Sequence, residues 1–289
     1  MKSIENITVH EALKRASSFL KKNGREENVA EIALRHVLRM DRVQLLTNLQ
    51  KILTSDEWNR FKAYIKGHVE GKPIQYLIGH EQFFGRSFTV NESVLIPRPE
   101  TEELICGMLE RIKKFFPPGK ELEVIDVGTG SGAIAITLKL EMPELDITAT
   151  DISKKALAVA EENAKRLGAG IRFLEADLFT PFVGRKRFDC IVSNPPYIPL
   201  GDRGTLSDTV KDHEPQTALF GGIDGLYYYR KMIKDLPHVI KQRALIGFEI
   251  GTGQGRAVKE LVLEQLPMAT VEVENDINGR ERMVFITVE

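Results

Sequence analysis

The stretch Leu122–Gly132, LEVIDVGTGSG, joins an apolar run to three closely spaced glycines and decides the fold of the chain. The run at 122–127 predicts a buried β-strand, and a helical pattern follows over 132–142. The glycines between them permit a tight turn and let backbone N–H groups approach a ligand closely. The stretch therefore predicts a strand, a ligand-facing loop and a helix, as at the start of an α/β domain.

The loop itself, Gly128-Thr129-Gly130-Ser131-Gly132, has the spacing G-x-G-x-G. This spacing differs from the dinucleotide fingerprint G-x-G-x-x-G, and the loop lacks the Gly-Lys-Ser/Thr of a phosphate-binding P-loop. Because such glycines also occur in ordinary turns, the neighbouring strand ends decide whether this loop binds a ligand.

Strands and helices alternate from the first strand to the end of the chain. This alternation predicts a doubly wound, mostly parallel sheet of seven strands, which binds ligands beyond the carboxyl ends of its strands. The strands are predicted at 122–127, 146–150, 171–175, 188–193, 243–250, 270–274 and 282–288. The main helices between them are predicted at 132–142, 154–167, 224–240 and 253–265. The segment 198–222 has little regular pattern, and a loop of that length is often functional.

Residues 1–72 have a different pattern, which predicts a small helical domain. Capping boxes begin at Thr8 and Thr54, and apolar residues recur at helical spacing after each of them. The segment contains no catalytic constellation, so we expect this domain to dock a partner.

The linker 73–95 separates the helical domain from a third region, 96–289. It contains EQFFGRSFTVN, two short β-prone runs that predict a hairpin around Gly85-Arg86. The third region is expected to begin with IPRP and a helix from about 101 to 116, ahead of the α/β pattern.

Composition narrows the class of protein. The 289 residues include 40 Lys+Arg and 41 Asp+Glu, which gives a net charge of -1. This balance argues against a large basic surface that binds nucleic acid electrostatically. Cys106 and Cys190 have no metal-ligand spacing, so we expect two buried thiols and no metal site. The polar start Met1–Glu5 lacks a signal-peptide pattern, and no apolar run is long enough for a bilayer, so a cytoplasmic protein is expected.

Acidic residues follow the second and third strands of the predicted sheet. Asp151 is placed to accept both hydroxyls of a ribose, or else to cap a helix, for which Ser153 competes. Asp177 is placed to accept from an exocyclic adenine amino group, with Leu178 or Phe179 against the ring, although alone it is equally a turn residue. Together with the glycine loop, these acids describe a nucleoside pocket.

The fourth strand ends in SNPPYIP, residues 193–199. Proline fixes φ, so Pro195 and Pro196 hold the Asn194 side chain and the Pro195 carbonyl in set directions. Both groups accept hydrogen bonds from an –NH2 group, and Tyr197 offers a flat face to a planar π system. The turn therefore suits a planar amine or amide nitrogen.

These strand ends, over residues 121–289, resemble the class I S-adenosylmethionine-dependent methyltransferases, of Rossmann-like fold. The NPPY pattern is similar to that of methyltransferases acting on exocyclic base amines or on glutamine amides. Leu178 stands where some members carry an aromatic residue. The resemblance implies S-adenosylmethionine as cofactor, bound by Gly128, Thr129, Gly130, Ser131, Gly132, Asp151, Asp177, Leu178 and Asn194.

Five motifs in order extend the likeness to nearly the whole chain: IPRPETEEL (96–104), GTGSG (128–132), SNPPYIP (193–199), HEPQTALFGGIDGL (213–226) and NGRERMV (278–284). They resemble the peptide-chain release factor glutamine methyltransferases. This resemblance implies methylation of the Gly-Gly-Gln glutamine amide in bacterial class I release factors. It also implies catalytic roles for Asn194 and Pro195, and substrate contacts from these two residues, Pro196 and Tyr197.

Other interpretations stay open. An adenine-amino methyltransferase acting on DNA or RNA shares the NPPY pattern, although the net charge and the acidic runs RPETEE and EVENDIN weigh against it. A nucleoside-binding protein without activity is a third class. Arg98 and Glu100 fit either a brace at the cofactor end of the pocket or a domain-linking ion pair. His213 fits a substrate-loop residue or a structural one, and no His-Asp pair suggests a general base.

Overall fold

A computed structural model describes residues 6–289, so the segment Met1–Glu5, with its expected lack of a signal peptide, lies outside the described residues. The chain divides into two compact units. The helical unit extends to His80 and includes Ser207–His213, and the sheet unit comprises Glu81–Leu206 and Glu214–Glu289. Among residues 6–289, no helix is long and apolar enough to span a bilayer.

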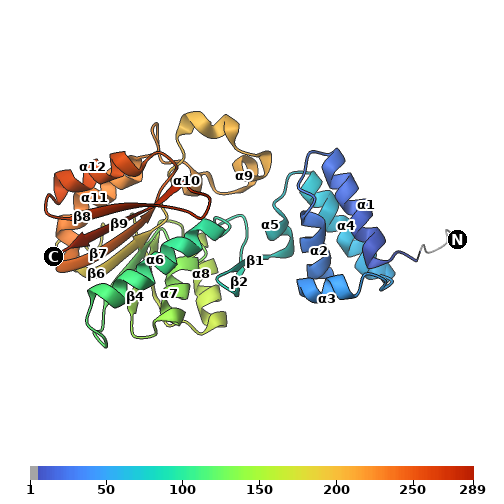
Figure 1. The fold of residues 1–289 in the computed structure, drawn as a ribbon, viewed down its shortest axis with the longest axis horizontal. Helices are drawn as coiled ribbons and strands as arrows, with labels where there is room; N and C mark the ends of the chain where they lie inside the picture. The colour runs from blue at the N-terminus through green and yellow to red at the C-terminus, as the bar shows by residue number, and fades with distance from the viewer. Residues whose placement is uncertain (1–5) are drawn as a thin grey trace. The chain divides into compact units, whose positions relative to one another are not determined.

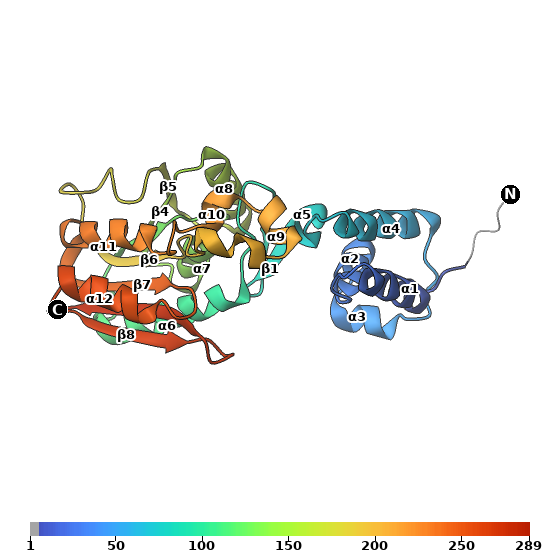
Figure 2. The same ribbon diagram turned by 90° about the horizontal axis from the view of Figure 1, so that it is seen from above.

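The helical unit is built from short amphipathic helices (Figure 2). They are α1 (Val9–Lys22), α2 (Val29–Leu38), α3 (Arg42–Thr47), α4 (Ser55–Val69), α5 (Ile74–Ile78) and α9 (Asp208–His213). The apolar faces of α1 to α5 meet in one core, which includes Leu20, Leu34 and Phe61, whereas α9 has no buried residue. The capping boxes predicted at Thr8 and Thr54 are confirmed, and a third joins Asp41 to Gln44 at the start of α3.

The sheet unit contains a seven-stranded sheet in the order β5-β4-β3-β6-β7-β9-β8 (Figure 1). Its strands are β3 (Glu123–Val127), β4 (Asp146–Asp151), β5 (Arg172–Glu175), β6 (Phe188–Ser193), β7 (Ile240–Glu249), β8 (Thr270–Asn275) and β9 (Glu281–Val288). The first five pair in parallel, whereas β9 runs antiparallel to both β7 and β8. The predicted fold class is therefore confirmed.

Helices cover both faces of this sheet (Figure 1). One apolar core contains side chains of α6 (Pro99–Phe115) and α7 (Ala133–Glu141), with Ala164 of α8 (Lys154–Leu167). A second core on the other face contains side chains of α11 (Tyr227–Val239) and α12 (Gly255–Gln265). The two cores hold the sheet rigid, so the loops at the carboxyl ends of β3, β4 and β6 start from fixed positions.

Short elements account for most differences from the sequence prediction. The segment 198–222 was expected to lack regular structure, yet it contains the 3₁₀ helix η1 (Leu200–Thr205) and the helices α9 and α10 (Gln216–Leu219). The linker contains the predicted hairpin, β1 (His80–Phe83) and β2 (Arg86–Thr89), after the unforeseen α5. Elements of four to six residues show too few turns for a hydrophobic period, so sequence periodicity misses them.

The prediction of two buried cysteines is wrong for one of them. Cys190 lies buried in β6, whereas Cys106 is exposed on the outer face of α6. Both are free thiols. The prediction failed because Cys106 shares the outward stripe of an amphipathic helix.

Candidate active site

A cavity of about 470 Å³ lies within the sheet unit, beyond the carboxyl ends of β3, β4 and β6. Most site residues predicted from the sequence line it: Gly128, Gly130, Asp151, Asp177, Leu178, Asn194, Pro195 and Pro196. Sequence reasoning missed the wall formed by Tyr227, Tyr228 and Lys231 of α11, and the segment Glu92–Leu95. Thr129, Ser131, Gly132 and Tyr197 do not line the cavity.

The glycine loop is tied to β4 by its backbone. The N–H groups of Gly128 and Thr129 both donate to the carbonyl of Thr150, at 2.8 and 2.9 Å. Gly128 and Gly130 have positive φ, and a Cβ built on either would meet no atom within 4 Å. Both residues therefore leave open space above the loop, where backbone can approach a ligand.

The other three loop residues hold the shape of the turn. Thr129 Oγ1 donates to Asp126 Oδ2 at 2.7 Å, and the carbonyl of Ser131 accepts from Asn163 Nδ2 at 3.0 Å. A Cβ on Gly132, whose φ is +82°, would lie 2.7 Å from Ile136 Cδ1. Substitution there would disturb the start of α7 rather than the cavity wall.

A fully buried carboxylate, Asp126, lies beneath the loop. Burial raises its pKa to about 7, although the hydrogen bonds from Thr129 and from the backbone of Ala135 oppose this shift. Its Oδ1 has no hydrogen-bond partner within the described part of the chain. A buried acceptor without a partner is costly, so this atom is suited to an ordered buried water.

Asp151 ends β4 at the cavity. Its carboxylate accepts from the backbone N–H groups of Gly130 and Ser153, each at 2.9 Å. Burial raises its pKa, which these hydrogen bonds lower. The N-cap of α8 is Ser153, whose side chain accepts from Ala156, so Asp151 does not cap that helix. The carboxylate is thus fixed in direction at the cavity wall.

Asp177 is paired with a cation that sequence reasoning did not foresee. Lys231 Nζ lies 3.0 Å from Asp177 Oδ2, and this hydrogen bond raises the pKa of Lys231. A ligand group that donates to Asp177 would therefore share this carboxylate with Lys231. Leu178 next to it has a φ of +52°, an uncommon conformation for a branched residue, and lines the cavity.

Asn194 follows β6 and reaches the first turn of α6. Its Nδ2 donates to Thr101 Oγ1 at 3.2 Å, and Thr101 Oγ1 donates to Glu249 Oε2 at 2.6 Å. This leaves Oδ1 of Asn194 as the acceptor for an incoming N–H group. Sequence reasoning missed both partners: Thr101 lies within IPRPETEEL, and Glu249 is an acid at the end of the apolar strand β7.

The hydroxyl of Tyr197 reaches the buried carboxylate of Glu249. Its hydroxyl donates to Glu249 Oε1 and accepts from Arg282 Nη1, each at 3.4 Å. Burial raises the pKa of the phenol. The ring therefore supports the turn from behind, and a direct contact with substrate stays a prediction.

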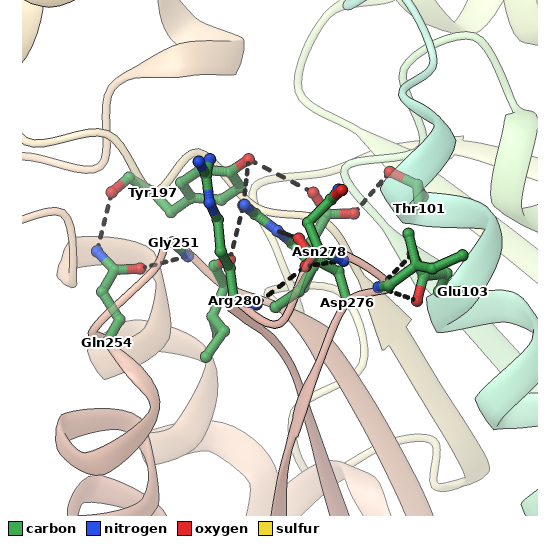
Figure 3. Close-up of polar contacts among 12 residues, drawn as sticks. Thr101, Glu103, Tyr197, Gly251, Gln254, Asp276, Asn278 and Arg280 are labelled. Atoms are coloured by element: carbon green, nitrogen blue, oxygen red, sulfur yellow. Dashed lines mark hydrogen bonds and ion pairs between the residues drawn. The ribbon is translucent and has the colours of Figure 1, made fainter.

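The NGRERMV motif forms the turn between β8 and β9. Asp276 accepts from the backbone of Asn278 and Arg280 at 2.9 and 3.0 Å (Figure 3), and its other oxygen lies 3.5 Å from Arg282 Nε. Arg282 in turn donates to the carbonyl of Ile250 at 3.2 Å. The turn thus fixes the cation that faces Tyr197.

The motif HEPQTALFGGIDGL forms the support under the NPPY backbone. Ile198 donates to the carbonyl of Leu219, and Gly221 donates back to the carbonyl of Ile198, at 3.0 and 2.9 Å. A Cβ on Gly221 would lie 2.4 Å from the Pro196 carbonyl oxygen, and one on Gly225 would lie 2.2 Å from that of Tyr197. Only glycine permits this close backbone contact.

Arg98 forms an ion pair within the sheet unit. Its Nη2 lies 2.5 Å from Glu214 Oε1, and the backbone of Ile96 donates to Glu214 Oε2 at 3.3 Å. The pair therefore joins the segment before α6 to the chain after α9, and neither residue lines the cavity. Glu100 does not line it either. His213 belongs to α9 in the helical unit, beside Gly71.

The mostly parallel sheet, the open glycine loop and an amide acceptor at the end of β6 define a Rossmann-like methyltransferase. Residues 11–79 match the family model of the PrmC N-terminal domain, and residues 108–207 match that of the methyltransferase small domain. The chain is 55% identical over 285 residues to the release factor glutamine methyltransferase of Bacillus anthracis, covering 98% of this chain and 100% of the relative. The chain belongs to the release factor glutamine methyltransferase family.

A second relative supports the family, and a solved structure supports the fold. The release factor glutamine methyltransferase of Bacillus subtilis is 50% identical over 278 residues, which is 96% of each chain. The crystal structure of a methyltransferase from Pyrococcus furiosus matches with a TM-score of 0.51 at 16% identity, covering 79% of this chain and 98% of that one. The second likeness supports the fold alone.

Methyltransferases of this class use S-adenosylmethionine, and the residues at the cavity suit this cofactor. Open space over Gly128 and Gly130 admits a ligand close to the backbone, and Asp151 offers a carboxylate to hydroxyl groups. Asp126, whose Oδ1 has no hydrogen-bond partner among the described residues, is fully buried and does not line the cavity. No group of three or more His, Cys, Asp or Glu side chains able to hold a metal occurs in residues 6–289.

We expect Gly221→Ala to lower methyl transfer by about 10²-fold, because the added Cβ displaces the Pro196 carbonyl and with it the adjacent turn. Gly201→Ala is the matched control, since a Cβ there meets nothing within 4 Å. The measurement is kcat with the unfolding midpoint of each variant. Equal kcat values for the two variants would show that the turn does not need this close contact.

Proposed function

We propose that this chain transfers a methyl group from S-adenosylmethionine to the side-chain amide nitrogen of a glutamine in a peptide-chain release factor. One observation carries the proposal: the Asn194 carboxamide is held through Nδ2 at the cavity, so that Oδ1 is left to accept an N–H. Membership of the family supports the choice of substrate. From the resemblance of the motifs, the target is the Gly-Gly-Gln glutamine of bacterial class I factors, in the cytoplasm.

For methyl transfer to occur, the protein must make an amide nitrogen nucleophilic. The nitrogen lone pair is delocalised into the carbonyl and becomes available only as the nitrogen pyramidalises. In this proposal Oδ1 of Asn194 and the carbonyl of Pro195 accept its two N–H groups and so favour that geometry. S-adenosylmethionine supplies an electrophilic methyl group on a sulfonium. The methylated nitrogen is acidic enough to release its proton to water, so a general base is not required.

Cofactor contacts are part of the proposal. We assign the ribose hydroxyls to Asp151 and the adenine amino group to Asp177, with Leu178 against the ring. Thr129, Ser131 and Gly132 would act by holding the loop, because they do not line the cavity. Pro196 would contact the substrate amide at the cavity wall.

The test uses tritiated S-adenosylmethionine with full-length release factor, the same factor with its Gly-Gly-Gln glutamine replaced by alanine, and duplex DNA. We expect label on the first substrate only. Asn194→Ala should lower kcat by about 10²-fold, as for loss of one preorganised contact in a transition state. Asn59→Ala, at an exposed position of α4, is the matched control for kcat. Label on DNA alone would contradict the proposed substrate and favour the adenine-amino alternative.

The helical unit is proposed to dock the release factor away from the reacting glutamine. It carries the exposed apolar side chains Val43, Leu46 and Ile52, which are 71%, 51% and 52% exposed on and after α3. A group of exposed apolar side chains on a small domain is typical of an interaction surface. Residues 1–72 are the docking domain of this proposal, 73–95 the linker and 96–289 the methyltransferase domain.

A double substitution, Val43→Glu with Leu46→Glu, should raise KM for full-length release factor roughly tenfold. Transfer to a short Gly-Gly-Gln peptide should be unchanged, because such a peptide reaches only the cavity. Met268→Glu, at a position 93% exposed in the sheet unit, is the control. An unchanged KM for the full-length factor would rule out docking through these side chains.

A further inference from the structure

Three side chains from three elements form a chain of hydrogen bonds behind the cavity. Asn194 follows β6, Thr101 lies in the first turn of α6, and Glu249 is the last residue of β7. The distances are 3.2 Å from Asn194 Nδ2 to Thr101 Oγ1 and 2.6 Å from Thr101 Oγ1 to Glu249 Oε2. Thr101 and Glu249 are 4% and 1% exposed, so solvent does not offer them other partners.

While Glu249 is ionised, the hydrogen bonds that link Asn194, Thr101 and Glu249 can run in only one direction. A carboxylate only accepts, so the single hydroxyl hydrogen of Thr101 is directed to Glu249. Thr101 Oγ1 can then only accept from Asn194, which turns Nδ2 toward Thr101. The same constraint turns Oδ1 away from Thr101, as an acceptor for substrate.

We propose that Thr101 and Glu249 are positioning residues that set the polarity of the Asn194 carboxamide, so that an acceptor and not a donor meets the substrate N–H. The inference rests on the proposed function and adds two residues to it. Neither touches the substrate: both act through Asn194. Their places in IPRPETEEL and at the end of β7 explain how elements far apart in sequence contribute to one turn.

Groups on several elements face Glu249. The Tyr197 hydroxyl donates to its Oε1, and the guanidinium of Arg282 on β9 and the carboxylate of Glu100 on α6 act on it through charge. Burial raises the pKa of Glu249 to about 7, while the Thr101 hydrogen bond and the charge of Arg282 lower it and Glu100 raises it. Its protonation therefore changes near neutral pH.

Protonation of Glu249 removes the constraint on Thr101. A carboxyl O–H can donate to Thr101 Oγ1, and the Thr101 hydrogen is then free to turn toward Asn194. The carboxamide can rotate and present Nδ2 to the substrate –NH2, which places two donors face to face. Asn194 Oδ1 faces the substrate only while Glu249 is ionised. The value of kcat should therefore increase as the pH rises through about 7, and it should be low at pH values below 7.

The kinetic test compares Thr101→Val, which removes the hydroxyl at constant shape, with Thr101→Ser, which keeps it. We expect Thr101→Val to lower kcat by about 10²-fold, with little change in KM for release factor or in S-adenosylmethionine affinity. Thr101→Ser should recover most of that loss. Glu249→Gln should abolish the acid limb of the kcat profile near pH 7. Equal kcat for the Val and Ser variants, or an acid limb kept in Glu249→Gln, would overturn the proposal.

A second readout needs no substrate. The side-chain amide signal of Asn194, assigned with Asn194→Ala in a ¹⁵N-labelled protein, should shift with an apparent pKa of about 7. Thr101→Val and Glu249→Gln should both abolish this titration, whereas Thr101→Ser should keep it. If the Asn194 signal titrates unchanged in Thr101→Val, Thr101 does not couple Glu249 to Asn194 and the proposal is wrong. If wild-type protein fails to label release factor, the proposed function is wrong. The titration of the Asn194 signal then still decides whether Glu249 and Thr101 orient the Asn194 carboxamide.

Discussion

The hydrogen bond from Thr101 to Glu249 joins the start of α6 to the end of β7, directly behind the turn that follows β6. It is buried, charge-assisted when Glu249 is ionised, and short at 2.6 Å, so it is among the stronger contacts of the site. The Asn194 carboxamide takes its direction from this bond, and Tyr197 packs its hydroxyl against the same carboxylate. The orientation of the acceptor at the cavity therefore depends on residues that do not line it.

Close backbone contact is the second constraint on the site. Gly221 and Gly225 let the loop after α10 lie directly against the carbonyls of Pro196 and Tyr197, where any Cβ would overlap them. Gln254 adds a hydrogen bond to the Tyr197 carbonyl at 2.9 Å. The prolines restrict the backbone φ angles within the NPPY turn. The contacts from Gly221, Gly225 and Gln254 hold the same turn from outside, so it has little freedom to relax.

Most of the fold could be predicted from the sequence, because long amphipathic helices and buried strands repeat their pattern several times. The glycine loop and NPPY turn were predictable for a different reason, since φ restrictions belong to the residue itself. Lys231, Thr101 and Glu249 could not be placed at the site, because their partners lie 54, 93 and 148 residues away in sequence. Such pairings depend on sheet order, which periodicity does not give.

The central claim is that a carboxamide oxygen and a backbone carbonyl hold the target nitrogen. The most direct measurement is a crystal structure of the chain with S-adenosylhomocysteine and a Gly-Gly-Gln peptide. The account predicts the glutamine nitrogen within hydrogen-bond distance of both Asn194 Oδ1 and the Pro195 carbonyl, with Asn194 Nδ2 still on Thr101. A glutamine nitrogen that contacts neither acceptor, or an Asn194 turned with Oδ1 toward Thr101, would contradict it.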